Sequence, residues 1–440
     1  MRHHPGHHDR LADGHQHLLR NRRGRGRRGL VLRSGRESGR GRRRCDLLLV
    51  TTTSTGPSAA VSAARLERVI SALTENRFAG RRVGTPGGHA AGLWLAARLR
   101  EIGASVTTDE FDVHDVRELY RTPQLAWRHG SAVQEFVHRR DFAEHLVSAD
   151  LPLQREGAVV TTAAEEWRDR WVLAPDLGVS ARALADSAAG LLLPRRADAE
   201  GWMPKMIAGP PAGKLPVLAV RTDLHEQMST TGGGTVSASM PLRSVDVTGS
   251  NVHGLFRTPG PGGISVLLTA HFDGVGDDPG QRLPAAADNA SGVAVVLEAA
   301  RVLVRLLPAS AGLRVTFLDA EEAGARGSAH HAPEVDPGTV VINIDGAAQL
   351  GEAAAVEAAG PAHDLLAALD HAGRETGVPL RAGAMASDNR RYAAAGLAAV
   401  GIGMGMPGYQ TPAETADRVE KDTLVAATRL VVATVRRLAS

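Results

Sequence analysis

The sequence predicts an α/β protein in which helices sandwich a mainly parallel mixed sheet and a β-rich domain is inserted into the chain. Strands and helices alternate from Asn251 to the C-terminus, and the strands are almost continuous apolar runs, as expected when both faces of a sheet are covered. Residues 118–248 have short β-like runs separated by Pro and Gly clusters, which indicates the insert. A chain of 440 residues is long enough for two domains.

The elements before the insert are two amphipathic helices and a strand. Apolar residues recur at helical spacing over residues 61–73 and again over 90–102, on either side of a Gly/Pro turn at 84–88. A strand is predicted at 106–113. In the insert we predict one clear helix, at 181–189, among short strands at 157–161, 171–174 and 215–220.

The elements after the insert form the predicted sheet and its covering helices. The apolar runs that predict strands are 264–270, 314–318, 340–344 and 397–402. The helical patterns between and after them are 290–307, 361–374 and 423–438. The expected domain organisation is therefore a basic head over residues 1–50, a first part of the main domain over 51–117, the insert over 118–248 and the rest of the main domain over 249–440.

The positive net charge of the chain arises in its first residues. Residues 1–46 contain fourteen arginines and four acidic residues, whereas the remainder is mildly acidic. A segment so rich in Arg, Gly and His, with few large apolar residues, predicts a disordered head. A nucleic-acid-binding arm and an upstream stretch wrongly included in the reading frame are the alternatives, although the head lacks aromatic residues for base stacking.

Some classes of protein are excluded by composition. Cys45 is the only cysteine, so neither an intrachain disulfide nor a cysteine zinc site can form. No run of 18 apolar residues predicts a membrane span, and the run at 47–50 is too short for the core of a signal peptide. We therefore expect a cytoplasmic protein without membrane contacts.

Polar residues follow several of the predicted strands. His271 and Asp273 end the first long strand, Glu321 and Glu322 follow the next, and Asp345 follows the third. Asp288 lies in a loop before a helix. Ligands gather outside the carboxyl ends of parallel strands, so these side chains are expected at one edge of the sheet.

A divalent metal site explains this combination best. Each residue alone has an ordinary structural explanation, such as a helix N-cap or a favourable charge at a helix N-terminus. Together, however, clustered carboxylates repel one another unless a cation compensates them. Imidazole with carboxylate oxygens suits zinc, and it suits manganese or cobalt nearly as well. We expect one or two zinc ions.

The sequence resembles the bacterial double-zinc aminopeptidases, whose relatives include glutamate carboxypeptidase, the transferrin receptor ectodomain and glutaminyl cyclase. The resemblance covers about residues 60–115 and 250–440. Its motifs are Asn-Arg-Phe-Ala-Gly-Arg-Arg at 76–82, Gly-Thr-Pro-Gly-Gly at 84–88 and Tyr-Gln-Thr-Pro-Ala-Glu-Thr at 409–415. Relatives are mostly exported, which leaves export as an alternative to the cytoplasm.

The resemblance implies a role for each residue at the sheet edge. It makes His271 and Asp345 ligands of one metal, Asp288 the bridge between two metals, and Glu322 a ligand of the second. Glu321 becomes the general base that accepts a proton from the attacking water, and Asp273 orients His271.

One position departs from the family pattern. The last family ligand is a His followed by Thr-Pro, and here Gln410 precedes Thr411 and Pro412. No His follows His371 in the chain, so no downstream replacement exists. An amide oxygen binds zinc more weakly than imidazole does, so the second metal site is expected to be the weaker one.

Two further resemblances concern the insert and a second enzyme family. Residues 181–194 and 214–220 resemble the protease-associated domain that is often inserted in this family. The aminoacylase-type amidohydrolases share the order of ligands, but they carry a lid domain between the last carboxylate and the last His. The stretch from Asp345 to Gln410 is too short for such a lid.

The function predicted from these observations is that of a metal-dependent exopeptidase acting on a peptide or small amide substrate. The alternative is a degenerate member of the family that binds a peptide or a protein partner without hydrolysis. Gln410 favours that alternative, and retention of Glu321 opposes it. A nucleic-acid-associated protein is a third hypothesis that rests on the basic head alone, and no specific nucleic-acid partner is expected. The sequence leaves substrate side-chain preference and oligomeric state open.

Overall fold

The computed structural model describes residues 61–440, and the expected disordered head over residues 1–50 lies outside the described residues. Among the described residues, no helix is long and apolar enough to cross a bilayer. The order of the elements follows the predicted alternation of strands and helices after the insert.

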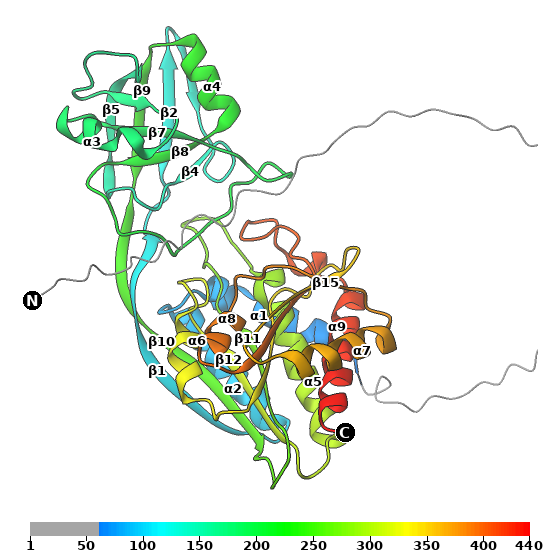
Figure 1. The fold of residues 1–440 in the computed structure, drawn as a ribbon. Helices are drawn as coiled ribbons and strands as arrows, with labels where there is room; N and C mark the ends of the chain where they lie inside the picture. Colours follow the sequence, from blue (N-terminus) through cyan, green and yellow to red (C-terminus); the bar gives the residue numbers. More distant parts are fainter. Residues whose placement is uncertain (1–60) are drawn as a thin grey trace, which may run out of the picture. The chain divides into compact units, whose positions relative to one another are not determined.

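The larger sheet has eight strands in the order β1-β10-β12-β11-β13-β16-β14-β15 (Figure 1). Its centre, β12-β11-β13-β16, is parallel, and β10 and β14 join the two sides of it antiparallel. The predicted mainly parallel mixed sheet is thus confirmed. The bounds are β1 Ser105–Leu119, β10 Leu242–Arg257, β11 Ser265–His271, β12 Gly312–Leu318, β13 Val340–Ile344, β14 Ala354–Ala359, β15 Leu380–Ala382 and β16 Ala398–Gly403.

Helices cover both faces of this sheet. Successive residues of the central strands point to opposite faces, so Val266 and Leu268 lie in one apolar core and Leu267 lies in another. The larger core includes α1 (Ala63–Leu73), α2 (Pro86–Glu101), α5 (Ser291–Leu306), α7 (His363–Thr376) and α9 (Lys421–Leu438). The smaller core packs on α8 (Asn389–Ala394), and α6 (Arg326–His331) lies beside α8. Burial on both faces explains why the strands are continuous apolar runs.

The second sheet contains all its strands between Gln124 and Met240. Its order is β3-β2-β9-β5-β6-β7-β8-β4. The bounds are β2 Gln124–His129, β3 Ala132–Glu135, β4 Phe142–Glu144, β5 Leu151–Thr161, β6 Trp171–Leu173, β7 Gly190–Arg195, β8 Val217–Arg221 and β9 Thr235–Met240. Two helices, α3 (Ser180–Ala185) and α4 (Thr222–Thr231), accompany them. The expected domain boundaries and the likeness to a protease-associated domain remain predictions.

The long pair β1 and β10 leads into and out of this segment. The two strands are antiparallel from Ser105↔Leu255 to Leu119↔Leu242, with one irregularity, and Figure 1 shows them as long neighbouring strands. The sequence predicted only 106–113 of β1. It also predicted a helix at 181–189, whereas α3 ends at Ala185 and the chain is already a strand from Gly190. That strand, β7, pairs with β6 and β8.

Candidate metal centre

The parallel strands bring the predicted ligands to one edge of the sheet. β11 ends at His271, and Asp345 directly follows β13, which pairs with β11 in parallel. Asp288 lies in the short irregular turn η4 (Ala286–Ala290) that precedes α5. Because the carboxyl ends of parallel strands meet at one edge, residues far apart in the sequence come together here.

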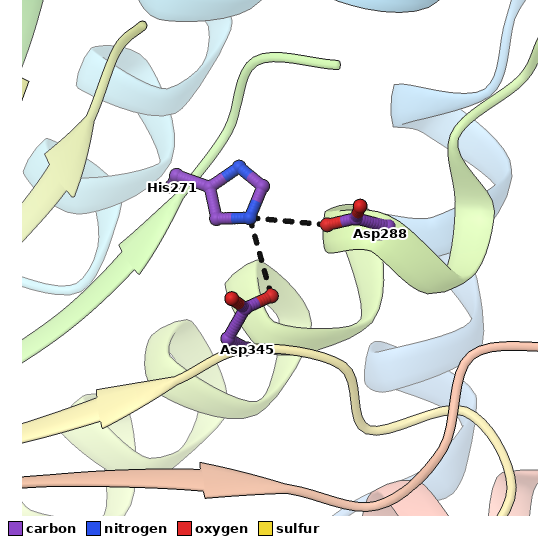
Figure 2. Close-up of side chains that lie close together, drawn as sticks. All are labelled: His271, Asp288 and Asp345. Atoms are coloured by element: carbon purple, nitrogen blue, oxygen red, sulfur yellow. Dashed lines mark hydrogen bonds and ion pairs between the residues drawn. The ribbon is translucent and has the colours of Figure 1, made fainter. Parts of the chain in front are cut away.

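Figure 2 shows the resulting cluster of His271, Asp288 and Asp345. The His271 Nε2 atom lies 3.1 Å from Asp288 Oδ1 and 3.2 Å from Asp345 Oδ1. One potential ligand atom from each residue lies within 4.8 Å of the others, and within residues 61–440 no other group of His, Cys, Asp and Glu meets that criterion. One nitrogen and two oxygens that converge on one point are a donor set that suits zinc, manganese or cobalt.

The electrostatics of the cluster call for positive charge. Burial by itself would lower the pKa of His271, but the charge of Asp345 and the hydrogen bonds to Asp273, Asp288 and Asp345 raise that pKa well above its usual value. Burial raises the pKa of Asp288, although His271 opposes the shift. A proton on His271 therefore compensates the two carboxylates, and a cation between the three residues would serve the same purpose.

Asp273 supports the cluster from behind. Its side chain is fully buried, and its carbonyl oxygen lies 3.2 Å from His271 Nδ1. Its two carboxylate oxygens accept hydrogen bonds from the backbone N–H groups of Glu321 (3.0 Å) and Glu322 (3.2 Å). Asp273 therefore fixes both the orientation of the imidazole and the turn that carries the acidic pair.

Glu322 lies opposite Gln410. The Gln410 Nε2 group donates a 2.5 Å hydrogen bond to Glu322 Oε2. Glu322 Oε1 and Gln410 Oε1 are both buried without a hydrogen-bond partner. Two buried acceptor oxygens without a donor are costly unless something positive satisfies them. The residues present therefore fit a second cation, held by oxygens on the side of Glu322.

Glu321 and Glu322 share an environment that disfavours negative charge. Burial is the main cause that raises the pKa of each carboxyl well above its usual range. The charges of Asp345 and Asp388 add to this for Glu321, and those of Asp288 and Glu321 add to it for Glu322. His271 acts in the opposite direction on both.

Glu414 is a residue of this site that the sequence analysis did not single out for a role. Its side chain is 1 % exposed, its Oε1 accepts from the Asp288 N–H at 2.6 Å and its Oε2 accepts from the Gln410 N–H at 2.7 Å. One carboxylate thus joins the backbones of two predicted ligand positions. Its presence four residues after Gln410 was the available signal, because it belongs to the same motif at 409–415.

Asp388 is a second buried acid that the sequence did not reveal. Ser328 Oγ donates to its Oδ1 at 2.5 Å, and its Oδ2 is buried without a partner. Burial raises the pKa of Asp388 to about 7, with His271 opposing and Asp345 adding to the shift. In the sequence, Ser387-Asp388-Asn389 resembles an ordinary helix start, so no signal distinguished it.

The structure thus brings together His271, Asp288 and Asp345, and it places Asp273 behind them. Glu322 lies with Gln410 and outside the three-residue cluster. His330 and His331 lie on α6, where His331 contacts Tyr392.

Comparisons with known proteins concern the family and the fold. Residues 251–435 match the model of Peptidase family M28. No curated protein matches the chain. The structure is similar to that of a zinc aminopeptidase from Bacillus subtilis, with 21 % identity, 85 % of this chain and 94 % of that chain covered, and a TM-score of 0.66.

Two other solved structures have the same fold. An aminopeptidase from Aneurinibacillus sp. strain AM-1 is 19 % identical, with 87 % of this chain and 95 % of that chain covered and a TM-score of 0.67. A peptidase M28 precursor from Shewanella amazonensis is 16 % identical, with 87 % and 95 % covered and a TM-score of 0.64. The resemblance inferred from the motifs is confirmed by the match of residues 251–435 to the model of Peptidase family M28.

Proposed function

We propose that the protein is a metal-dependent exopeptidase of the aminopeptidase type, which hydrolyses peptide or related amide bonds with Glu321 as general base. The observation that carries the proposal is the convergence of His271, Asp288 and Asp345 at the carboxyl ends of the central strands, beside Glu321. The match to Peptidase family M28 and the structural similarity to two bacterial aminopeptidases support it.

The residues that would hold metal divide into two groups. His271, Asp288 and Asp345 would hold one ion, and Asp288, Glu322 and the Gln410 amide oxygen would hold a second. A divalent cation there would lower the pKa of water towards neutrality and would polarise a substrate carbonyl.

The chain itself supplies proton transfer and positioning. Glu321 has a raised pKa because it is desolvated among other acids, which suits a group that accepts a proton from the attacking water and passes it to the leaving amine. Asp273 accepts a hydrogen bond from the Glu321 backbone N–H at 3.0 Å and so fixes the backbone position from which the Glu321 side chain extends. Glu414 positions Asp288 and Gln410 relative to each other.

A second function is favoured by one observation, the replacement of the family histidine by Gln410. A member of the family that binds a peptide or a protein partner without hydrolysis would tolerate a weak second metal site. Such a protein has no need of a proton acceptor at position 321.

The test compares the wild-type chain with Glu321→Gln. We expect wild-type protein loaded with zinc or manganese to hydrolyse aminoacyl chromogenic amides, and Glu321→Gln to lose about 10²–10⁴-fold in rate at unchanged metal content. The substitution keeps the size of the side chain, so elemental analysis and the melting temperature serve as controls for the fold.

Two results would decide against parts of this proposal. Metal binding without turnover on any amide would favour the binding protein. Full activity in the Glu321→Gln variant would show that another group accepts the proton.

A further inference from the structure

A cavity of about 350 Å³ lies away from the predicted ligands, where the N-terminus of α2, the end of β1 and the loop after β11 meet. Its lining includes Arg82, Arg117, Lys205 and Gly87, together with Glu118 and Asp277. No predicted ligand and no residue given a catalytic role lines it. Four basic side chains, these three and Arg77, and two acidic ones line the cavity, and Arg77 is paired with Glu75 at 2.9 Å.

Arg117 brings a buried guanidinium group to this lining without an ion pair to any described residue. It is 2 % exposed, its Nη1 donates to Ser244 Oγ at 2.8 Å, and its Nη2 donates to the carbonyl oxygen of Ser148 at 2.7 Å. Both acceptors are neutral, and the Nε group is buried without a hydrogen-bond partner. Within the described part of the chain, Arg117 takes part in no ion pair.

Arg82 is also a buried arginine with one N–H group that lacks a partner. It is 8 % exposed, its Nη2 lies 2.5 Å from Glu118 Oε1, and its Nη1 is buried without a partner. Glu118 is shared, because its other oxygen lies 2.6 Å from Arg243 Nη2. One carboxylate therefore faces two guanidinium groups, which leaves an excess of positive charge beside the cavity.

The remaining lining residues do not neutralise this excess of positive charge. The Lys205 ammonium group donates to the carbonyl oxygens of Gly276 and Asp277 and forms an ion pair with Asp278. Gly87 lies in the first turn of the 16-residue helix α2, whose dipole adds positive potential. Burial lowers the pKa of Arg82 and of Arg117, which reflects the cost of holding two guanidinium charges away from water.

We propose that this cavity is a binding site for a small oxyanion, a phosphate or carboxylate group, which accepts from the unpartnered N–H groups of Arg82 and Arg117. A buried N–H group on a cation costs free energy unless an acceptor satisfies it, and oxyanions are the acceptors that guanidinium groups match best. The proposal does not depend on the proposed peptidase function, because none of its residues belongs to the metal centre.

The test is calorimetric titration of the full chain, as purified, with inorganic phosphate and separately with acetate, at constant ionic strength. We expect at least one of the two anions to bind with a stoichiometry of one. Arg82→Gln and Arg117→Gln should each weaken that binding about tenfold or more, the loss expected when a charged hydrogen bond disappears. Binding of phosphate identifies the site with phosphates, and binding of acetate alone identifies it with carboxylates.

Two control variants make the test specific. Arg374→Gln removes an exposed arginine outside the cavity and should leave the affinity unchanged. His271→Ala should also leave it unchanged, which separates this site from anions bound at the metal centre. Arg117 also holds Ser148 and Ser244, so Arg82→Gln decides the matter if Arg117→Gln does not fold. Absence of binding by both anions, wild-type affinity in Arg82→Gln, or loss of binding in His271→Ala would overturn the proposal.

Discussion

Gln410 occupies the position at which the family resemblance predicts a histidine ligand. Its backbone is held on both sides, since its N–H donates to Glu414 and its carbonyl oxygen accepts from the Lys205 N–H at 2.9 Å. Its φ of 54° lies in the left-handed region, which His tolerates better than most residues. The loop should therefore keep its course when the side chain changes.

Replacement of this residue tests the second metal position directly. We expect Gln410→His to raise occupancy of the second metal and to increase amide hydrolysis, because imidazole binds zinc better than a carboxamide oxygen does. The metal-to-protein ratio and the rate should be measured together, with zinc and with manganese. A ratio that stays at one, with no gain in rate, would mean that position 410 is not a ligand position.

The two groups of predicted ligands are expected to differ in metal affinity. His271→Ala is expected to cost more metal affinity than Gln410→Ala, because His271 faces Asp288 and Asp345 at 3.1 and 3.2 Å while Gln410 offers one neutral oxygen. Calorimetric titration of both variants with zinc gives the ranking. The reverse order would show that the stronger site lies on the side of Glu322.

At the scale of elements, the start of α5 is packed tightly against the strand end that carries Asp345. A Cβ added at Gly292 would lie 2.2 Å from Asn289 Oδ1 and 2.5 Å from the carbonyl oxygen of Ile344. Asn289 in turn accepts from the Gly292 and Gly346 N–H groups and donates to the Ile344 carbonyl oxygen. These contacts join the turn of Asp288 to the end of β13.

Gly292→Ala is therefore expected to lower both the melting temperature and the zinc affinity, with a loss of stability of about 1–3 kcal/mol, as is typical of overpacking. Gly92→Ala is the matched control, because a Cβ there would meet nothing closer than 3.6 Å and Ala favours the helix by up to about 1 kcal/mol. Calorimetric unfolding and zinc titration of the two variants provide the comparison. Equal behaviour of the two would show that the helix start does not set the ligand geometry.

At the scale of the whole molecule, a buried ionic cluster joins the segment of the second sheet to the loop after β11. Arg139 is fully buried, and it lies 2.9 Å from Glu144 in β4 and 2.6 Å from Asp278. Lys205 lies 3.1 Å from the same Asp278. Burial alone would raise the pKa of Glu144, but Arg139 and His138 outweigh it and lower that pKa to about 2. Arg139 likewise lowers the pKa of Asp278.

These depressed pKa values predict an acid-sensitive junction. A carboxylate with a lowered pKa contributes stability that is present above its unfolded pKa and is lost as the pH falls through the folded value. We expect the free energy of unfolding to fall between about pH 4.5 and pH 2, with Glu144 contributing on the order of 3 kcal/mol at neutral pH. Urea unfolding over this range would measure the fall.

A variant pair assigns the effect to the cluster. Glu144→Gln should flatten the acid dependence and lower the stability at neutral pH, since Arg139 loses an anionic partner. Asp370→Asn, which removes an exposed carboxylate on α7, should change neither. An unchanged slope in Glu144→Gln would show that acid sensitivity arises elsewhere.

Much of the main sheet, and the cluster of His271, Asp288 and Asp345, followed from the sequence because the signals there are local. Strands such as β11 and β13 are apolar on both faces, so their runs are visible without knowledge of their partners. His271 and Asp345 lie at the ends of these strands, whichever strands they pair with. No element was predicted where local preference and pairing disagree, as in β14, whose residues Ala-Ala-Val-Glu-Ala-Ala favour a helix and form a strand beside β16.

The sequence by itself indicated the class of fold and the resemblance to Peptidase family M28, and it predicted residues that could bind a metal, because these depend on periodicity, motif and chemical type. Only the tertiary structure decided which atoms are left without partners. Residues distant in the sequence surround the side chains of Glu414, Asp388, Arg82 and Arg117. Burial therefore changes the free-energy cost of their charges only in the folded chain. That cost depends on the position of each group in the folded chain, and the local sequence does not indicate it.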